Sequence, residues 1–332
     1  MSSQTIEIPS VIGGREVTTG ELRDVRAPHR HDLLLARCHE GGAKEAARAV
    51  DASLGAWRGW SATPFAERSA VFLRAADLLS TKYRSILNAA TMLGQSKTAY
   101  QAEIDSACEL IDFLRFNVAF AHRIHEEQPL SPTGTRNTEE PRPLEGFVFA
   151  VTPFNFTAIA GNLPAAPALL GNTVVWKPAS NAVLSAHFIM QLLIEAGLPP
   201  GVINMVHGSP PVIAEAVVAR PELAGVHFTG STEVFRGLWK TIGDRIGTYR
   251  NFPRLVGETG GKDFVFVHPS ADVDALAVAL ARGAFEYQGQ KCSAASRVYV
   301  PASLYPLVKE RLAALIADIR VGDVANFRNF MG

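Results

Sequence analysis

The 332 residues are 47% hydrophobic and 19% charged, a composition typical of a soluble globular protein with about two domains. Lysine plus arginine and aspartate plus glutamate both number 32, so the formal net charge is zero and no bulk attraction to nucleic acid or an anionic membrane is expected. The three cysteines, Cys38, Cys108 and Cys292, form no CxxC pair, which argues against a zinc site or a disulfide framework and favours a reducing compartment.

The N-terminal residues lack the basic and apolar regions of a signal peptide and the arginine-rich character of a transit peptide. No uncharged run reaches the ~18–20 apolar residues that a membrane span needs. We therefore expect a cytoplasmic protein without a membrane partner.

Residues 1 to about 42 predict short strands and turns, and residues 43–126 predict helices because apolar residues recur at three- and four-residue steps. The helical segments are 43–60, 64–80, 84–93 and 97–120. In the last segment the apolar stripe is Ile104, Ala107, Leu110, Ile111 and Leu114. The carboxylates Asp105, Glu109 and Asp112 lie on another face, which we predict to be solvated rather than to bind a metal.

Residues 127–145 are rich in proline, threonine and glycine and have no helical period. They predict a connector, or an exposed hairpin that pairs with another subunit.

From residue 146 onward, strands and helices alternate. Strands are predicted at 147–151, 173–176, 202–206 and 226–228, with helices at 164–170, 185–195, 212–219 and 233–246. Continuous Val, Ile and Phe strands between amphipathic helices indicate a doubly wound, Rossmann-like parallel sheet. A second α/β alternation follows, with strands at 255–256, 264–267 and 298–300 and helices at 273–285 and 304–319. The predicted domains are thus 1–126 with 146–256, joined by 127–145, and an incomplete unit at 257–332.

Polar side chains follow three of these strands, at the edge where open α/β sheets bind ligands. Asn155 follows the first strand and could donate to a substrate oxygen, although a loop-capping asparagine fits equally. Lys177 ends the second strand and could reach a ribose or a phosphate, although most lysines are simply solvated. Gly230 and Ser231 precede a helix whose N-terminus could hold an anion, as many ligand-free helix starts also do. The usual G-x-G-x-x-G and Walker patterns are absent.

Glu258 and Cys292 complete the candidate set. Glu258 lies where an apolar strand enters a glycine turn, so it is either a general base or a solvated turn residue. Cys292 lies at a helix-to-strand junction among small residues and is either a nucleophile or a core cysteine. A neighbouring cation raises the thiolate fraction of a cysteine, and Lys291 is one candidate for that cation.

Several segments give the chain a close resemblance to the aldehyde dehydrogenase superfamily, and within it to the branch that acts on L-glutamate γ-semialdehyde. The segments are Gln101–Asp105, Glu109–Asn117, Pro153–Ile159, Trp176–Pro178, Phe228–Ser231, Phe252–Leu255, Gly257–Glu258, Gly260–Lys262, Phe285–Tyr287 and Gly289–Ser293. The resemblance implies a Rossmann-like NAD-binding domain at 146–256 and the first part of a catalytic domain at 257–332. It also implies NAD-dependent oxidation of the semialdehyde to L-glutamate, a step of proline degradation.

The resemblance also implies roles for individual residues. Cys292 would attack the aldehyde, the Asn155 amide and the Cys292 backbone N–H would hold the oxyanion, and Glu258 would activate the water that releases the acid. The cofactor positions are Thr152, Lys177, Gly230, Ser231, Thr232, Glu233 and Val234. Phe156 would line the substrate slot, Ser293 would bind the substrate α-carboxylate and Glu109 would lie near the α-ammonium.

The resemblance further implies a chain that is truncated at its C-terminus, because family members continue past residue 332. We therefore expect low or no activity for this length alone and a homo-oligomer for the full-length protein, in the cytoplasm or, in a eukaryote, in the mitochondrial matrix. Ala179-Ser180 follows Lys177-Pro178 where relatives often have an acidic residue, so the preference for NAD over NADP is less firmly implied. The alternatives are a dehydrogenase for another semialdehyde and a non-catalytic dinucleotide-binding protein. A cysteine hydrolase is less consistent with the sequence, since no histidine lies near Cys292.

Overall fold

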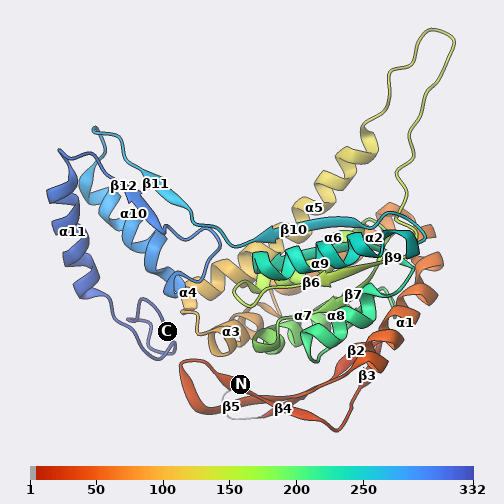
Figure 1. Ribbon diagram of the computed structural model, residues 1–332, viewed down its shortest axis with the longest axis horizontal. Coiled ribbons are helices and arrows are strands. Elements are labelled where there is room, and N and C mark those ends of the chain that lie inside the picture. The colour runs from red at the N-terminus through yellow and green to blue at the C-terminus, as the bar shows by residue number, and fades with distance from the viewer. Residues whose placement is uncertain (1–4) are drawn as a thin grey trace.

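The computed structural model describes residues 5–332, and its centre is a seven-stranded sheet with helices on both faces (Figure 1). In their order across the sheet, the strands are β10 (Arg254–Thr259), β9 (Leu223–Gly230), β6 (Phe147–Val151), β7 (Thr173–Lys177), β8 (Ile203–Met205), β2 (Ser10–Ile12) and β3 (Arg15–Val17). Neighbours from β10 to β8 are parallel, whereas β2 and β3 are antiparallel additions at the β8 edge. The predicted doubly wound α/β fold is confirmed.

The apolar strands explain why helices cover both faces of this sheet. In β6, Phe147 and Phe149 point to one face and Val148 and Ala150 to the other, and all four are buried. The first face packs against α1 (Ala43–Ala62), α8 (Pro210–Val218) and α9 (Thr232–Asp244). The second face packs against α2 (Phe65–Ser80), α5 (Glu109–Glu126), α6 (Thr157–Leu169) and α7 (Val183–Glu195).

The strand order places a switch point between β6 and β9. The chain proceeds from β6 through β7 to β8 on one side of the sheet and then from β9 to β10 on the other. Connections leave the carboxyl ends of β6 and β9 in opposite directions, which opens a crevice there.

The N-terminal strands form a second, three-stranded sheet of β1 (Ile6–Ile8), β5 (Arg30–His39) and β4 (Leu22–Ala27). It packs on α3 (Arg84–Gln95) and on the start of α7 through a small apolar cluster that includes Ala36, Ala90 and Leu184. The prediction of short strands in this part of the chain is confirmed for the described residues.

The predicted single helix over 97–120 is wrong in one respect. The structure has a short α4 (Ala99–Ala102), a π-helical turn (Glu103–Cys108) and then α5. A π turn carries more residues than an α turn, so it rotates the following side chains around the axis. Ile104, expected in the apolar stripe, is 42% exposed, and Asp105, expected on the solvated face, is buried.

Residues 127–145 extend away from the rest of the molecule as two exposed, extended segments (Figure 1). Hydrogen bonds join the two segments: Gln128 pairs with Glu139, and the Asn137 side chain donates to the Leu130 carbonyl. Their function as a connector or subunit contact stays a prediction.

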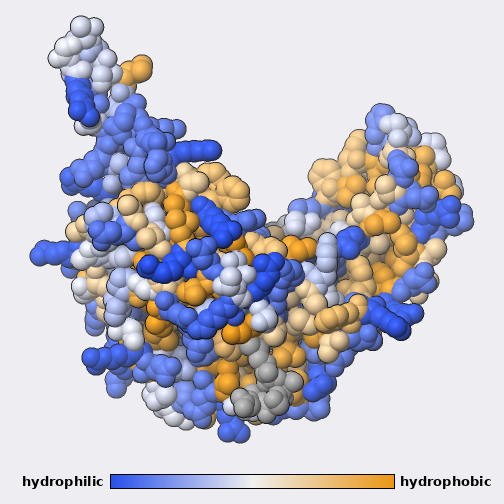
Figure 2. Space-filling model, turned by 180° about the vertical axis from the view of Figure 1, so that it is seen from behind, coloured by the Kyte–Doolittle hydropathy of each residue, from blue (hydrophilic) through white to orange (hydrophobic). Residues whose placement is uncertain are grey.

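The last part of the chain holds the parallel pair β11 (Phe264–Phe266) and β12 (Arg297–Tyr299) with α10 (Val273–Phe285) and α11 (Tyr305–Asp318). This unit stands apart from the sheet, and the space-filling view shows a hollow beside it with apolar side chains on its surface (Figure 2). Strand β10 runs across the expected domain boundary at 256/257, and that boundary stays a prediction. Among helices within residues 5–332, none combines the length and apolar composition needed to cross a bilayer.

Candidate active site

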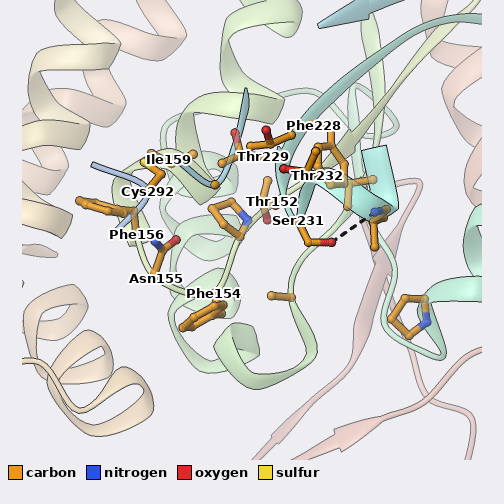
Figure 3. A pocket seen from close by; sticks show the side chains of 18 of the residues that line it. Thr152, Phe154, Asn155, Phe156, Ile159, Phe228, Thr229, Ser231, Thr232 and Cys292 are labelled. Carbon is orange, nitrogen blue, oxygen red and sulfur yellow. Dashed lines mark hydrogen bonds between the residues drawn. The ribbon is translucent and has the colours of Figure 1, made fainter. Parts of the chain in front are cut away.

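A cavity of about 900 Å³ opens at the carboxyl ends of β6 and β9, where the switch point leaves the crevice. Its wall contains most of the residues that the sequence singled out: Thr152, Asn155, Phe156, Lys177, Gly230, Ser231, Thr232, Val234 and Cys292. In close view Cys292, Asn155 and Phe156 gather at one end, and Ser231 and Thr232 lie at the other (Figure 3). One cavity therefore joins a thiol, an amide donor and a helix N-terminus.

Cys292 lies in the loop that follows α10 and precedes β12, as the sequence predicted. Its thiol donates to Oε1 of Glu258, on β10, with 3.7 Å between sulfur and oxygen. Burial and then the Glu258 carboxylate raise the pKa of the Cys292 thiol, while the backbone amides of Ser293 and Cys292 act in the opposite direction. The Cys292 thiol is thus protonated at rest, and the titratable group nearest to it is the Glu258 carboxylate.

Lys291, the candidate cation beside this thiol, pairs with two carboxylates. Its ammonium lies 3.4 Å from the carboxylates of both Asp105 and Glu286. It also lies over the Phe156 ring, 5.5 Å from the ring centre. These two carboxylates neutralise the charge of Lys291, whose side chain lines the cavity.

Asn155 leaves the end of β6 and meets the cysteine loop directly. Its Nδ2 donates to the backbone carbonyl of Gln290 over 2.8 Å, two residues before Cys292. An amide nitrogen carries two hydrogens, so one fixes the loop and the second remains for a ligand oxygen.

Ser231 and the first turn of α9 form the opposite end of the cavity. The Ser231 hydroxyl caps the helix by accepting from the Val234 N–H at 3.2 Å. Nearby, the Trp176 indole N–H donates to the Thr152 hydroxyl at 3.0 Å, which fixes that side chain in the wall. A helix N-terminus with free N–H groups suits the diphosphate of a dinucleotide.

Lys177 is buried at the end of β7 and donates to the Pro178 carbonyl at 2.9 Å. Burial lowers its pKa to about 8, and the Glu40 carboxylate partly opposes that shift. An ammonium held at this edge of the cavity is placed to donate to the hydroxyls of a ribose.

Four sequence-predicted residues do not line the cavity: Glu258, whose carboxylate accepts from the Cys292 thiol, and Glu233, Ser293 and Glu109. Glu233 points into solvent, with its side chain 84% exposed. Ser293 is exposed beside Cys292, and Glu109 is half-buried at the start of α5. Burial, followed by the charge of Asp105, raises the pKa of Glu109 to about 7, while Lys97 and Lys291 lower it. Glu109 is thus part of a charged cluster and not of the solvated face that the sequence predicted.

The sequence reasoning missed the buried side chains behind the cysteine loop, above all Lys97 and Tyr287. Lys97 occurs in a short Gln-Ser-Lys-Thr link between helices, and a lysine in such a link is usually solvated. Phe154 and Phe228 were also missed as lining residues, although their position after β6 and within β9 is the same strand-end signal that identified Asn155.

The comparisons with known proteins agree with this geometry. The model of the aldehyde dehydrogenase family matches residues 16–332. The probable delta-1-pyrroline-5-carboxylate dehydrogenase of Schizosaccharomyces pombe is 49% identical over an alignment that covers 98% of this chain and 61% of that protein. The mitochondrial delta-1-pyrroline-5-carboxylate dehydrogenase of Dictyostelium discoideum is also 49% identical, over 98% of this chain and 59% of its own length.

Among solved structures, the delta-pyrroline-5-carboxylate dehydrogenase of Mycobacterium tuberculosis bound with NAD superimposes with a TM-score of 0.97 at 55% identity, covering 100% of this chain and 62% of that chain. The chain therefore spans about three fifths of the length of the relatives it matches. The family match over nearly all of its residues and the superposition of the fold lead to one conclusion: the chain belongs to the aldehyde dehydrogenase family.

Proposed function

We propose that this chain carries the NAD-dependent oxidation of L-glutamate γ-semialdehyde to L-glutamate, a step of proline degradation. The observation that supports this most is the single cavity that joins the Cys292 thiol and the Asn155 amide to the N-terminus of α9. Family membership supports the reaction class, and the names of the relatives support the substrate and the pathway. The NAD-bound relative supports the cofactor.

The chemistry begins at Cys292. Glu258 accepts the thiol proton, and the sulfur forms a bond to the aldehyde carbon. The oxygen that gains the electron pair is held by the second Nδ2 hydrogen of Asn155 and by the Cys292 backbone N–H. The thiohemiacetal formed in this way becomes a thioester when its carbon loses a hydride, and NAD, when bound, would supply the acceptor for that hydride.

The thioester that remains on Cys292 is then hydrolysed. Glu258 first releases the thiol proton to solvent and then takes a proton from water, so that the hydroxide adds to the thioester carbon. The carbon–sulfur bond breaks to release the acid, and the thiolate takes the proton back from Glu258. The 3.7 Å between the sulfur and the Glu258 carboxylate supports its acting in both steps.

The residues at the cofactor end fit a dinucleotide. Ser231, Thr232 and the first backbone amides of α9 would hold the diphosphate, and Lys177 would donate to a ribose. Ala179 and Ser180 line the same end without a carboxylate, so a preference for NAD rests on the NAD-bound relative rather than on charge repulsion.

The proposed substrate carries a carboxylate and an ammonium, and we propose one residue as the partner of each. Phe156 forms an apolar wall for the carbon chain. Ser293 would donate to the α-carboxylate, and the Glu109 carboxylate would attract the α-ammonium.

The test of the proposed function compares two aldehydes, with NAD as the cofactor, on the purified 332-residue chain. We expect NAD to bind in titration calorimetry, and NADH to form faster with glutamate γ-semialdehyde than with succinate semialdehyde, at a low absolute rate for this length. Faster oxidation of succinate semialdehyde would favour a dehydrogenase for another semialdehyde.

A non-catalytic dinucleotide-binding protein is the second candidate, and the observation that favours it is the three-fifths coverage of the relatives. Iodoacetamide distinguishes the two, because Cys38 is fully buried and burial raises its pKa to about 12. We expect Cys292 to be alkylated faster than Cys38 and Cys108. Equal rates together with absent NADH formation would favour the non-catalytic protein.

Glu109 gives a pH-dependent prediction. Its pKa of about 7 means that the carboxylate ionises as the pH rises, so attraction for an ammonium is lost below that pKa and present above it. We expect the affinity for the product L-glutamate, measured as protection of Cys292 from iodoacetamide, to rise roughly eightfold between about pH 6 and about pH 7.5. The dissociation constant is taken from the glutamate dependence at each pH, which removes the intrinsic pH dependence of alkylation.

Glu109→Gln is expected to weaken protection and flatten this pH profile. Asp112→Asn, an exposed carboxylate on the same helix, is the matched control and should leave the profile unchanged. An unchanged slope in Glu109→Gln would remove Glu109 from the substrate site.

We also propose that the full-length protein is a homo-oligomer, since residues 127–145 extend from the body with exposed backbone. The cellular location is proposed to be the cytoplasm, or the mitochondrial matrix if the source is a eukaryote. The names of the relatives from Dictyostelium discoideum and Bos taurus call those proteins mitochondrial. Residues 146–256 and 257–332 are proposed as the cofactor-binding and catalytic parts.

A further inference from the structure

A fully enclosed lysine lies directly behind the cysteine loop. The Lys97 side chain is 0% exposed, and its Nζ lies 2.6 Å from Oδ2 of Asp105, whose side chain is 5% exposed. Fully buried lysines are rare, and desolvation disfavours their charged form unless partners compensate. Here burial lowers the pKa of Lys97 to about 8, and the Asp105 carboxylate opposes that shift.

Two aromatic rings enclose the same ammonium, and each belongs to a different loop of the cavity. The Lys97 Nζ is 4.3 Å from the centre of the Phe156 ring and 4.4 Å from the centre of the Tyr287 ring. Cation–π contacts are strongest where water is excluded, as it is here. Phe156 follows Asn155, and Tyr287 begins the turn that leads to Cys292. Lys97 therefore joins the two segments that carry the amide donor and the thiol.

The turn that Lys97 contacts has an unfavourable backbone. Tyr287 and Gln288 have φ values of 50° and 55°, and Gly289 follows at 67°. A left-handed backbone is unfavourable for a residue with a side chain, so the surroundings must hold it. This reversal brings the Gln290 carbonyl to the Asn155 amide.

Asp105 extends the connection to the residue beside the thiol. Its Oδ2 lies 3.4 Å from the Lys291 ammonium as well as 2.6 Å from that of Lys97. The π-helical turn Glu103–Cys108 is what directs Asp105 inward to this place. The Asp105 carboxylate thus contacts two lysines, Lys97 in the link before α4 and Lys291 after the left-handed turn.

We propose that Lys97 and Asp105 are positioning residues that hold segment 286–291 against the Asn155 loop and so fix the amide donor relative to the Cys292 sulfur. The link between this positioning and catalysis rests on the proposed function, whereas the positioning itself does not. Lys97→Met keeps an unbranched apolar side chain that is one atom shorter and removes the charge. Lys291 remains as a partner for Asp105 in that variant.

The experiment is amide hydrogen exchange on the whole 332-residue chain. In Lys97→Met we expect exchange in 286–292 to speed up at least about tenfold, with α9 and NAD affinity unchanged. Lys82→Met, which removes an exposed lysine paired with Glu195, is the matched control and should change neither segment. Unchanged exchange in 286–292 would overturn the positioning role.

If Lys97→Met does not fold, Asp105→Asn repeats the measurement with nearly the same shape, and the same increase is expected. The effect of the variant on catalysis is measured separately. We expect kcat to fall roughly 10–100-fold with the KM for NAD unchanged. Faster exchange with an unchanged kcat would overturn the link to catalysis. Wild-type chain that oxidises no aldehyde would contradict the proposed function, and the exchange result would still decide the positioning.

Discussion

Cys292→Ala is expected to reduce NADH formation from glutamate γ-semialdehyde by at least about 10⁴-fold, because a covalent mechanism has no route without its nucleophile. NAD affinity should stay within about twofold of wild type. The diphosphate contact proposed for Ser231 lies at the other end of the cavity (Figure 3), and alanine at position 292 leaves Ser231 and Lys177 in place. The measurement is NADH absorbance in steady state beside NAD titration of the same preparations.

Cys108→Ala is the matched control, since it removes a partly exposed thiol that donates to the Glu103 carboxylate on the π-helical turn. It should leave NADH formation within about twofold of wild type. Residual turnover well above background in Cys292→Ala, or an equal loss in Cys108→Ala, would contradict the assignment of Cys292 as the nucleophile.

The fold was largely predictable because local apolar patterns dictate it. The run 147–151 is continuously apolar and became β6 with the same bounds, and the helical period over 273–285 became α10 with the same bounds. The N-terminal strands were predicted as strands, but their partners were not. Strand β2 joins the seven-stranded sheet by pairing Val11 with Met205. These residues are far apart in sequence, and no local pattern specifies their contact.

The candidate site was predictable to the extent that strand ends converge. Asn155 and Ser231 each follow a parallel strand, so sheet geometry places them at one edge. Asp105 was assigned wrongly to a solvated face, because its burial depends on the π-helical turn that directs it inward. The candidate role of Lys291 stays a prediction, and its pairing with Asp105 depends on the same turn. Lys97 was missed for the same reason, since its burial depends on rings from two distant loops.

Asn155→Ala is expected to lower kcat by about 10²–10³-fold, the usual effect of losing one oxyanion donor. The oxyanion develops only as the sulfur adds to the aldehyde, so the loss should lower kcat and kcat/KM alike and leave NAD affinity unchanged. A kcat near that of wild type would remove Asn155 from the oxyanion site.

Asn155 also donates to the Gln290 carbonyl, so the variant could act through the loop instead of through the lost donor. Hydrogen exchange separates the two causes, because a loop effect would speed exchange in 286–292 as Lys97→Met does. We expect the Asn155→Ala loss of kcat to exceed that of Lys97→Met while exchange in 286–292 changes less. The reverse order would mean that the amide holds the cysteine loop and that the Cys292 backbone N–H is the main donor to the oxyanion.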